Sequence, residues 1–422
     1  MGQKSDVNGG RARRPAILLA AIALLALAIP AIADAKKGKG APKVKVMTRN
    51  VFLGADLTPA LEAGSLGEAI DAAGVIINEL DATRFGDRAV PLAREIKKSK
   101  AHLVGLQEVA LWRDQTPSDL PPEFGGTPAE NVRYDFLELL LDQVNKRGGK
   151  GKKAAASKKK GGPKYKVVHV QEEFDQELPA DTDQSDATGG AFGADLDGRL
   201  TMRDVILAKK GSKVNLGKTN GAQYTTKFQA EVGPLDIPVE RGWQSVEAKV
   251  GGKGKGKRAS ASMHKDNPTS KFRFVNTHLE AFGDPTIREA QAKELIAGPL
   301  TTNKQVVLVG DINSGLPDPH NVGNLPGQDP NDPLAFRALV AAGFKDNGAK
   351  NLNKPYPQTC CYDDLFDASL TFDHTVDHVL TEPGLKTRKA FVTGNDPAER
   401  TQSGLWPSDH GGKVSRVQLK KK

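Results

Sequence analysis

The chain contains a set of carboxylate, amide and imidazole side chains that come directly after, or within, short apolar runs. In α/β proteins, ligand-binding and catalytic residues gather at strand ends, because a rigid sheet holds the loops that carry them. The set offers hard oxygen ligands that suit Mg²⁺ better than zinc, and two histidines that can move a proton or contact an oxyanion. This inventory suits hydrolysis of a phosphate ester by a metal ion and a general base. The members are Asn50, Glu108, His278, Asp311, Asn313, Asp377, Asp409 and His410.

Each of these residues, taken singly, has an ordinary structural explanation. An asparagine after a strand, such as Asn50, is usual in a turn, and the Asp-Ile-Asn-Ser run at 311–314 is typical of a loop entry. A single histidine is more often a well-packed structural residue than a catalyst. Only the set as a whole indicates chemistry.

Apolar runs with a period of two, or without interruption, predict strands next to these residues, and amphipathic runs predict helices. Strands and helices are mixed without the regular alternation of a barrel. We therefore expect an α/β (α+β) fold in which stacked sheets are flanked by helices. The expected helices span 58–80, 91–100 and 135–145, and the expected strands span 44–48, 102–106, 167–170, 205–208, 272–277, 305–309, 375–380 and 413–419.

Composition excludes several classes of protein. The chain has 422 residues, of which 26% are charged and 38% hydrophobic, which rules out a wholly disordered chain and a polytopic membrane protein. Two cysteines exclude a multi-disulfide scaffold and a cysteine-rich zinc protein. Cys360 and Cys361 are adjacent, so we expect a strained vicinal disulfide or pairing between chains, and we interpret them as a structural feature of a loop.

The first 33 residues have the pattern of a secretory signal peptide. Arg11, Arg13 and Arg14 precede an apolar run over 16–32 that ends in small residues. This run is shorter than the ~20 residues that a spanning helix needs, so a cleaved signal is favoured over a retained anchor. We expect a secreted protein, or a periplasmic or cell-surface one if the segment is retained. Residues 34–42 would follow as a basic flexible leader, and 43–422 as the main domain.

Two stretches rich in lysine and glycine interrupt the main domain. Residues 146–166 contain ten cationic residues and no acid, and residues 249–262 form a second stretch of this kind. We interpret both as mobile surface loops, because they cannot bury enough apolar surface to order themselves. Together with a net charge of +9, they make nucleic acid the favoured partner. The alternative is that they are solvated spacers.

Six motifs occur in a fixed order over residues 43–419, and the Gly-Asp-Ile-Asn and Ser-Asp-His pieces are the most specific. They resemble the motifs of the endonuclease/exonuclease/phosphatase superfamily, which includes deoxyribonuclease I, exonuclease III, bacterial sphingomyelinases and inositol polyphosphate phosphatases. The motifs are Met-Thr-Arg-Asn-Val (47–51), Val-Gly-Leu-Gln-Glu-Val (104–109), Asn-Thr-His-Leu (276–279), Val-Gly-Asp-Ile-Asn-Ser (309–314), Val-Asp-His-Val-Leu (376–380) and Ser-Asp-His-Gly-Gly (408–412).

The resemblance implies a four-layer sandwich, in which two mixed β-sheets pack face to face and helices cover their outer sides. It also implies a divalent metal ion, most simply Mg²⁺, with Mn²⁺ or Ca²⁺ as alternatives. Glu108 would ligate this ion, and Asn50 and Asp409 would complete or support its ligand shell.

The resemblance further implies the catalytic roles. His410 would activate the attacking water, and Asp377 would hold its imidazole in the right tautomer. Asp311 and Asn313 would position the nucleophile and contact the phosphate. His278 would donate to a phosphoryl oxygen as charge develops there.

Two positions stay open in the sequence. The segment 197–205 stands where the superfamily has a strand with a further polar active-site residue, and Arg203 and Asp204 are the alternatives. Asp373 and His374 form a second Asp-His pair near Asp377, although the apolar neighbours of Asp377 favour the latter. The run at 372–377 also lacks the Cys-Asp-Arg sequence of inositol phosphatases, which disfavours that substrate class.

We expect an exported, Mg²⁺-dependent phosphodiesterase that acts on nucleic acid in the manner of an endonuclease. The alternative enzyme is a sphingomyelinase-like or phospholipase C-like hydrolase of membrane lipid headgroups, although the sequence has no clear apolar hairpin for membrane docking. The alternative from another class is an inactive polyanion-binding protein, against which the intact motif set argues. No protein partner is evident.

Overall fold

The computed structural model describes residues 40–146, 164–185, 193–251, 269–315, 333–346 and 358–421. Ala41–Lys422 forms one compact unit. The predicted signal peptide lies outside the described residues, as do most of the leader and of the two basic stretches, so these assignments stay predictions. Across the described ranges, none of the helices combines the length and the apolar character that crossing a membrane requires.

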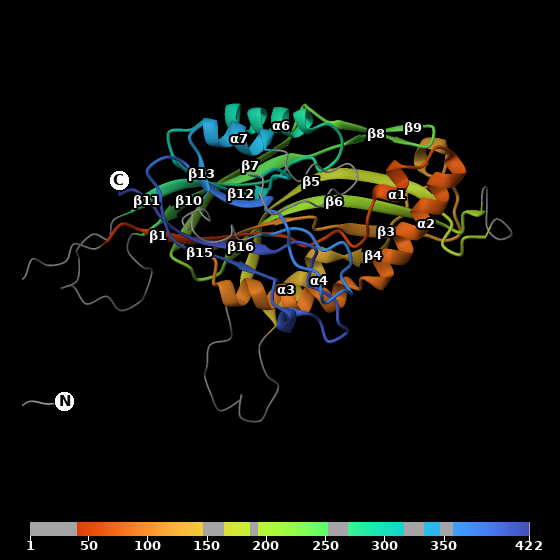
Figure 1. Cartoon of the computed structure of the whole chain (residues 1–422), viewed down its shortest axis with the longest axis horizontal. Helices are drawn as coiled ribbons and strands as arrows, with labels where there is room; N and C mark the ends of the chain where they lie inside the picture. Colours follow the sequence, from red (N-terminus) through yellow and green to blue (C-terminus); the bar gives the residue numbers. More distant parts are fainter. Residues whose placement is uncertain are drawn as a thin grey trace, which may run out of the picture. The chain divides into compact units, whose positions relative to one another are not determined.

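Two mixed β-sheets form the centre of this unit (Figure 1). The first contains β1 (Lys43–Asn50), β2 (Leu103–Gln107), β3 (Leu111–Gln115), β4 (Asn131–Asp135), β5 (Tyr165–Ala180), β6 (Leu196–Lys209), β15 (Lys386–Thr393) and β16 (Gly412–Gln418). Within the described ranges its strand order is β15–β16–β1–β2–β6–β3–β4, and β5 pairs with β6. β1 and β2 run parallel, whereas β1 and β16 are antiparallel.

The second sheet contains β7 (Val214–Gln223), β10 (Gly242–Val250), β11 (Ser270–His278), β12 (Gln305–Asp311), β13 (Lys345–Asp346) and β14 (Asp377–Thr381). Its order is β13–β14–β12–β11–β10–β7 in the part of the chain that is described. β11 and β12 are parallel, and β14 is antiparallel to β12. Each sheet thus has one central parallel pair in the described ranges, and four of the motif residues lie at the ends of these two pairs.

Helices cover the outer face of each sheet, which gives four layers. They are α1 (Thr58–Leu61), α2 (Leu66–Ala82), α3 (Phe85–Ser99), α4 (Phe136–Asn145), α6 (Pro285–Ala297) and α7 (Leu334–Ala341), with short 3₁₀ turns at Pro122–Phe124 and Pro397–Glu399. α2, α3 and α4 pack on the first sheet, and α6 and α7 pack on the second.

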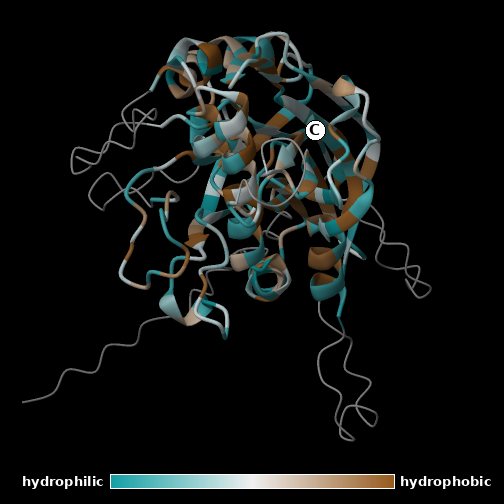
Figure 2. Cartoon of the chain, turned by 90° about the vertical axis from the view of Figure 1, so that its right-hand side faces the viewer, coloured by the Kyte–Doolittle hydropathy of each residue, from teal (hydrophilic) through white to brown (hydrophobic). Residues whose placement is uncertain are grey.

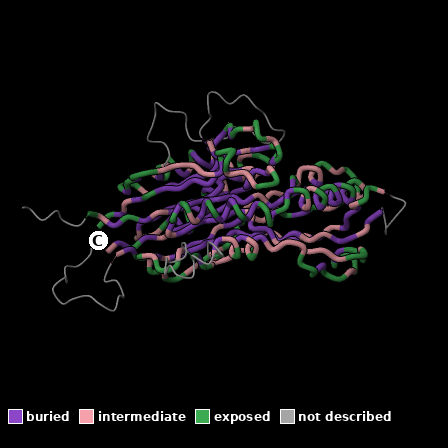
Figure 3. The backbone as a smooth tube through the Cα atoms, turned by 90° about the horizontal axis from the view of Figure 1, so that it is seen from below, coloured by how far each residue is buried: buried purple, intermediate pink, exposed green. Residues whose placement is uncertain are grey.

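Three apolar cores join the four layers. The core between the sheets includes Val46 and Phe274, which are both fully buried. Leu92 belongs to the core under α3, and Leu295 to the core under α6. Figure 3 shows the buried residues concentrated in the strands and the exposed ones on the outer helices and loops. Brown hydrophobic and teal hydrophilic residues alternate along the strands in Figure 2, as expected for strands with differently packed faces.

Hydrogen bonds cross the space between the sheets just beneath the motif residues. The Thr48 hydroxyl donates to Gln107 Oε1 at 3.1 Å, and Gln107 Nε2 donates to Asn276 Oδ1 at 2.6 Å. The sheets also approach closely at Gly105, where a Cβ atom would lie 2.1 Å from Asn276 Oδ1. A glycine is therefore required at this position to let the Asn276 side chain reach the first sheet.

A separate two-stranded hairpin, β8 (Phe228–Val232) and β9 (Leu235–Val239), lies beside α1 and α2 (Figure 1). Its turn is only two residues long and places Gly233 at a φ of +57°, a backbone conformation that favours glycine. The Gly233 N–H donates to the carbonyl of Ala63 at 3.0 Å, which ties the hairpin to the α1–α2 connection.

Several predicted elements differ from the observed ones. The helix-rich stretch predicted over 58–80 contains two helices, because Ser65 caps α2 by accepting a hydrogen bond from Glu68 N at 3.2 Å. The helix predicted to start at residue 91 begins at Phe85 and contains Pro91. The strands predicted at 167–170 and 205–208 are parts of the long strands β5 and β6, whose charged residues hid their extent.

Candidate active site

The ends of the two central parallel pairs bring four motif residues to one edge. Asn50 is the last residue of β1, and Glu108 follows β2, its parallel neighbour. His278 ends β11 and Asp311 ends β12, and the two residues are paired in register. Because parallel strands end at the same edge, both sheets deliver polar side chains to the same place.

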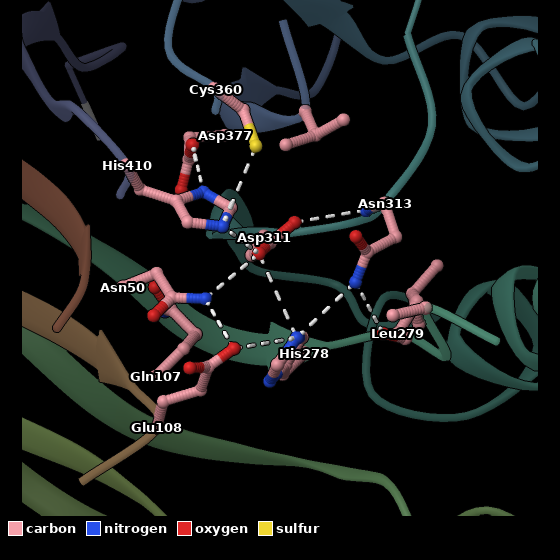
Figure 4. Close-up of polar contacts among 12 residues, drawn as sticks. Asn50, Gln107, Glu108, His278, Leu279, Asp311, Asn313, Cys360, Asp377 and His410 are labelled. Atoms are coloured by element: carbon pink, nitrogen blue, oxygen red, sulfur yellow. Dashed lines mark hydrogen bonds and ion pairs between the residues drawn. The ribbon is translucent and has the colours of Figure 1, made fainter. Parts of the chain in front are cut away.

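Antiparallel strands that begin at this edge supply the remaining residues. Asp377 is the first residue of β14 and pairs with Asp311 of β12. Asp409 and His410 directly precede β16, the antiparallel neighbour of β1. Figure 4 shows seven of the eight motif residues, with carboxylates, amides and imidazoles pointing toward one another. Their roles stay predictions, but their convergence is a property of the fold.

Asn50 connects the carboxylates of the two sheets. Its Nδ2 atom donates to Glu108 Oε1 at 2.7 Å and to Asp311 Oδ2 at 3.0 Å. Its Oδ1 atom accepts from the Phe52 N–H at 2.9 Å, which fixes the orientation of the amide. The second oxygen of Glu108 accepts from Leu53 N at 2.8 Å.

The carboxylates at this edge are electrostatically crowded. Burial raises the pKa of Glu108, and the nearby Asp409 carboxylate raises it further. Burial is also the main reason why the pKa values of Asp311 and Asp409 are raised. Buried carboxylates that disfavour one another's ionised form are a donor set that fits a hard divalent cation.

Distances between donor atoms define two overlapping groups at this edge. Within the described ranges, donors of Glu108, His278 and Asp311 lie within 4.8 Å of one another, and so do donors of Asp311, Asp377 and His410. Asp311 belongs to both groups, whereas Asp409 belongs to neither. Asp409 is nevertheless close enough to act on the pKa of Glu108, so it fits a supporting place better than a shared one.

The His410 imidazole is held by Asp377. The distance from His410 Nδ1 to Asp377 Oδ2 is 2.9 Å, and His410 Nε2 lies 3.6 Å from Asp311 Oδ2. A carboxylate at Nδ1 makes this nitrogen the donor and leaves Nε2 facing the other carboxylates. Burial alone would lower the pKa of His410, but Asp377, Asp409 and Asp311 hold it well above its usual value.

The backbone around His410 is fixed by residues of β1. The Arg49 guanidinium donates to the carbonyl of His410 and pairs with the buried Glu95 at 3.1 Å. The Ser408 hydroxyl donates to the carbonyl of Asn50 at 2.9 Å and accepts from the His410 N–H at 3.1 Å. The Ser-Asp-His turn is therefore attached to the strand that carries Asn50.

His278 faces the same carboxylates from the second sheet. Arg241 NH1 lies 3.2 Å from His278 Nδ1, and an arginine can only donate, so Nδ1 accepts and the hydrogen sits on Nε2. Nε2 lies 3.6 Å from Asp311 Oδ2 and 3.9 Å from Glu108 Oε1. Burial, followed by the charge of Arg241, holds the pKa of His278 well below its usual value. A lowered pKa favours the neutral imidazole, and Nε2 is the nitrogen that faces the carboxylates and the Asn313 amide.

Two residues at this edge adopt the left-handed backbone region that non-glycine residues rarely occupy. Glu108 has a φ of +58° and Asn313 a φ of +45°. The Asn313 N–H donates to Asp311 Oδ1 at 3.0 Å, and its Nδ2 donates to the carbonyl of Leu279 at 2.9 Å. These contacts hold a conformation that costs about 1–3 kcal/mol and that turns both side chains toward the other motif residues.

The structure also places residues here that the motifs did not identify. Asp204 is fully buried beside Glu108, whose backbone contributes to the environment of its carboxylate. Glu173 on β5 is likewise buried with both oxygens unpartnered. Burial raises the pKa of both acids well above the usual range, and the neighbouring Arg241 opposes the shift. Arg241 in turn pairs with Glu280 at 3.5 Å.

The two open positions of the sequence differ clearly in the structure. The guanidinium of Arg203 turns away and contacts the carbonyls of Val109 and Ala110 and the Asp135 carboxylate, which caps α4. Asp204 is therefore the residue of this pair that borders the motif residues. No signal in the sequence identifies its partner Arg241, because 37 residues separate the two positions along the chain and they meet only in the folded domain.

The adjacent cysteines lie at the same edge. Cys360 and Cys361 are bonded to each other, and Cys360 Sγ is 3.6 Å from His410 Nε2. The second Asp-His pair is separate from the motif residues: His374 Nδ1 contacts Asp373 Oδ1 at 2.5 Å. His374 Nε2 lies 3.9 Å from Cys361 Sγ.

Comparison with known proteins agrees with these motifs. The profile of the Endonuclease/Exonuclease/phosphatase family matches residues 77–410 of the chain. The chain belongs to this family. Members of the endonuclease/exonuclease/phosphatase family are metal-dependent phosphoesterases, so the protein is a phosphoric ester hydrolase. No curated protein matches the chain.

Solved structures with a similar fold include other members of the family. A family protein from Bacteroides thetaiotaomicron has 14% sequence identity and a TM-score of 0.44, with 89% of this chain and 98% of that chain covered. Truncated Caenorhabditis elegans TDP2 has 16% identity and a TM-score of 0.41, with 89% and 98% covered. The human Nocturnin catalytic domain with bound sulfate has 14% identity and a TM-score of 0.43, with 90% and 96% covered.

Proposed function

We propose that this protein is an exported, Mg²⁺-dependent hydrolase of phosphodiesters. One observation carries the proposal: the Asp377–His410 pair faces the carboxylate set across a distance of 3.6 Å from His410 Nε2 to Asp311 Oδ2. A histidine held by a carboxylate is a general base, and a buried set of hard oxygen ligands is a divalent-cation site. Their contact is what hydrolysis of a phosphate ester requires.

The cation would be held by Glu108 and Asp311, with Asn50 and Asp409 as supporting groups. When bound, it offsets the charge of these carboxylates and polarises a phosphate oxygen. The Asp377 carboxylate at His410 Nδ1 makes that nitrogen the donor and leaves Nε2 as the acceptor. His410 Nε2 can then accept a proton from a water molecule as its oxygen attacks phosphorus.

His278 and Asn313 would contact the phosphate group of the substrate rather than the attacking water. The neutral His278 presents its Nε2–H toward the carboxylates, where a phosphoryl oxygen would lie, and donates to it as charge develops. Asn313 Nδ2 lies 3.2 Å from the same nitrogen, so the amide and the imidazole border one position. Asp311 accepts from the Asn313 backbone and keeps this loop against the metal ligands.

Two substrate classes fit the proposal. Nucleic acid is favoured by the net charge of +9 and by the basic stretches at 146–166 and 249–262, most of which lie outside the described residues. The headgroup of a membrane lipid is the second candidate, and an apolar cavity beside Arg241, described below, favours it. Each class provides a phosphodiester, so the site chemistry is shared.

The test is a substrate panel with purified protein that lacks residues 1–33. Plasmid DNA, RNA, sphingomyelin and bis-p-nitrophenyl phosphate are incubated with Mg²⁺ or with EDTA. We expect hydrolysis of at least one diester with Mg²⁺, loss of that activity in EDTA, and its recovery when Mg²⁺ is restored. Secretion is tested separately, by N-terminal sequencing of the protein recovered from the culture medium.

Matched variants connect the activity to the site. His410→Ala should abolish turnover, whereas His374→Ala, in the Asp-His pair outside the site, should retain it. Equal activity of His410→Ala and the unaltered protein would overturn the assignment of the base. A folded protein that retards DNA in a gel but hydrolyses nothing would favour the polyanion-binding alternative.

A further inference from the structure

An apolar cavity lies at the end of the domain where β5 and β6 extend beyond the second sheet. Its volume is about 110 Å³, counted as the space that the centre of a water molecule can occupy. β5 and β6 form one wall, α1 and α2 a second, and the β8–β9 hairpin a third, and Figure 1 shows these elements gathered at one end. Ile77, Leu200, Met202, Ile237 and Phe282 are among the lining residues.

The cavity borders, at Arg241, the sheet edge that carries the motif residues, which we call the catalytic edge. This residue lines the cavity, and its NH1 atom lies 3.2 Å from Nδ1 of His278. A second connection runs through Trp112, which lines the cavity and whose Nε1 donates to the carbonyl of Leu53 at 2.8 Å. The Leu53 N–H donates to Glu108 Oε2 at 2.8 Å. The apolar space and the metal-binding carboxylate thus share a wall.

The floor of the cavity, formed by β6, changes from apolar to polar toward the catalytic edge. Gly198, Leu200 and Met202 line it from alternate positions of β6, and Asp204 is the next residue in this alternation. Apart from Arg241, Glu240 and Gln176, the lining residues carry no amide, carboxylate or guanidinium group. A ligand that fills this space therefore has a long apolar part, and its polar end lies toward Arg241 and His278.

We propose that this cavity binds the hydrocarbon chain of the substrate, which would be a phosphate ester of an alkyl or acyl lipid. The inference rests on the proposed phosphodiesterase function and selects its substrate class. Apolar cavities exclude water and accept apolar ligands, because filling them removes hydrocarbon surface from water. Arg241 is the cation among the lining residues, and it lies where the cavity borders the catalytic edge.

Binding of n-alkylphosphonates tests the cavity without any catalysis. Calorimetric titration compares ethylphosphonate with octylphosphonate in Mg²⁺-loaded protein. Each buried methylene is worth about fourfold in affinity. The octyl compound has six more methylenes than the ethyl compound, so burial of only half of them makes it bind about sixty-fold more tightly. An unchanged dissociation constant along the series would overturn the proposal, as would octanol binding as tightly as octylphosphonate.

Two neighbouring residues of β8 provide the variant and its control. Ala230 is buried and lines the cavity, so Ala230→Trp should fill it and reduce the chain-length effect to less than about threefold. Glu231 is exposed on the other face of the same strand, so Glu231→Trp should leave the effect intact. Thermal unfolding checks that each variant is folded. If the Ala230→Trp variant does not fold, Ala60→Phe fills the cavity from the wall formed by α1.

Turnover separates failure of this proposal from failure of the proposed function. The substrates are ethyl and octyl p-nitrophenyl phosphate, which share one leaving group. We expect a higher kcat/KM for the octyl ester in the unaltered protein and in Glu231→Trp, but not in Ala230→Trp, with the ethyl ester unaffected by either variant. Hydrolysis of both esters at equal kcat/KM would remove the cavity from substrate binding while leaving the phosphodiesterase in place. If phosphonate binding depended on chain length but no ester were hydrolysed, the cavity proposal would stand and the proposed phosphodiesterase function would fail.

Discussion

The Nδ2 atom of Asn50 lies 2.7 Å from Glu108 Oε1 and 3.0 Å from Asp311 Oδ2, so a single amide joins carboxylates from the two sheets. Glu108 belongs to the first sheet and Asp311 to the second. The amide supplies two donated hydrogen bonds to acids that burial has made harder to ionise. Glu108 and Asp311 are also the proposed ligands of the divalent cation, and Asn50 lies beside them. Changes at Asn50 should therefore affect both the stability of this edge and metal binding.

Replacing this amide by a third carboxylate should make the protein depend on metal for stability. We expect Asn50→Asp to lose about 1–3 kcal/mol of unfolding free energy in EDTA, because two donated hydrogen bonds are exchanged for like-charge repulsion. Excess Mg²⁺ should then raise the melting temperature of the variant more than that of the unaltered protein. Thermal unfolding with and without Mg²⁺ measures both effects. Asn131→Asp, at an exposed position, is the control and should show neither.

The Asp377–His410 contact predicts a large effect on turnover from a very small change. Asp377→Asn keeps the shape of the side chain but removes the charge that orients and supports the imidazole at 2.9 Å. We expect kcat for bis-p-nitrophenyl phosphate to fall about 10²- to 10⁴-fold. Asp373→Asn makes the same change in the neighbouring pair and should alter kcat less than about twofold, within the range expected for a residue outside the chemistry. Similar losses in the two variants would contradict the assignment.

Arg241 predicts a coupling between stability and a buried acid. Arg241→Met leaves Glu280, Asp204 and Glu173 without their cation, so we expect a loss of about 3–5 kcal/mol in urea unfolding. Part of this loss should return in the double variant with Asp204→Asn, because the neutral amide needs no counter-charge. A double-mutant cycle gives the coupling energy. Strictly additive effects would show that Arg241 does not act on Asp204.

His102 predicts a pH dependence that does not involve the metal site. Its Nδ1 accepts the Lys45 N–H at 3.2 Å, and burial, with three nearby cations, lowers its pKa from 6.5 to about 4. The unfolded chain therefore takes up this proton first as the pH falls, so the contribution to stability is complete above about pH 6.5 and is lost between 6.5 and 4. The loss is at most about 3 kcal/mol.

The variant His102→Asn isolates that contribution. Its amide oxygen can accept the Lys45 N–H but does not titrate in this range. We expect the unfolding free energy of the unaltered protein to fall more steeply between pH 6.5 and 4 than that of His102→Asn. Parallel curves from urea unfolding would show that the His102 proton is not linked to folding.

Local patterns were sufficient to locate most of the motif-bearing strands. The run Val306–Val309 is apolar and β-branched, and it lies within β12, whose last residue is Asp311. Asp135 was predicted to begin a helix, and it caps α4 by accepting from Leu137 N at 2.9 Å. Convergence of the polar residues at one edge then follows from the parallel pairing of strands that end next to them.

Long-range features could not be predicted in the same way. Most of β5 after residue 170 consists of acids and amides with few apolar residues, and it is a strand because it pairs along its whole length with β6. Asp204 and Arg241 have no sequence pattern that relates them, since their proximity depends on how the two sheets pack. The β8–β9 hairpin is short and partly polar, so its sequence did not reveal that it walls an apolar cavity.

The hydrogen bonds from Thr48 through Gln107 to Asn276 lie in the interior of the protein, and they determine the geometry of the catalytic edge from there. This interior connection, together with the absence of a side chain at Gly105, sets the spacing between the motif residues of the two sheets. The surrounding loops do not set this spacing. Exchanging these loops between relatives should therefore change the substrate specificity without disturbing the catalytic residues. This makes the domain a suitable scaffold for engineering new specificities.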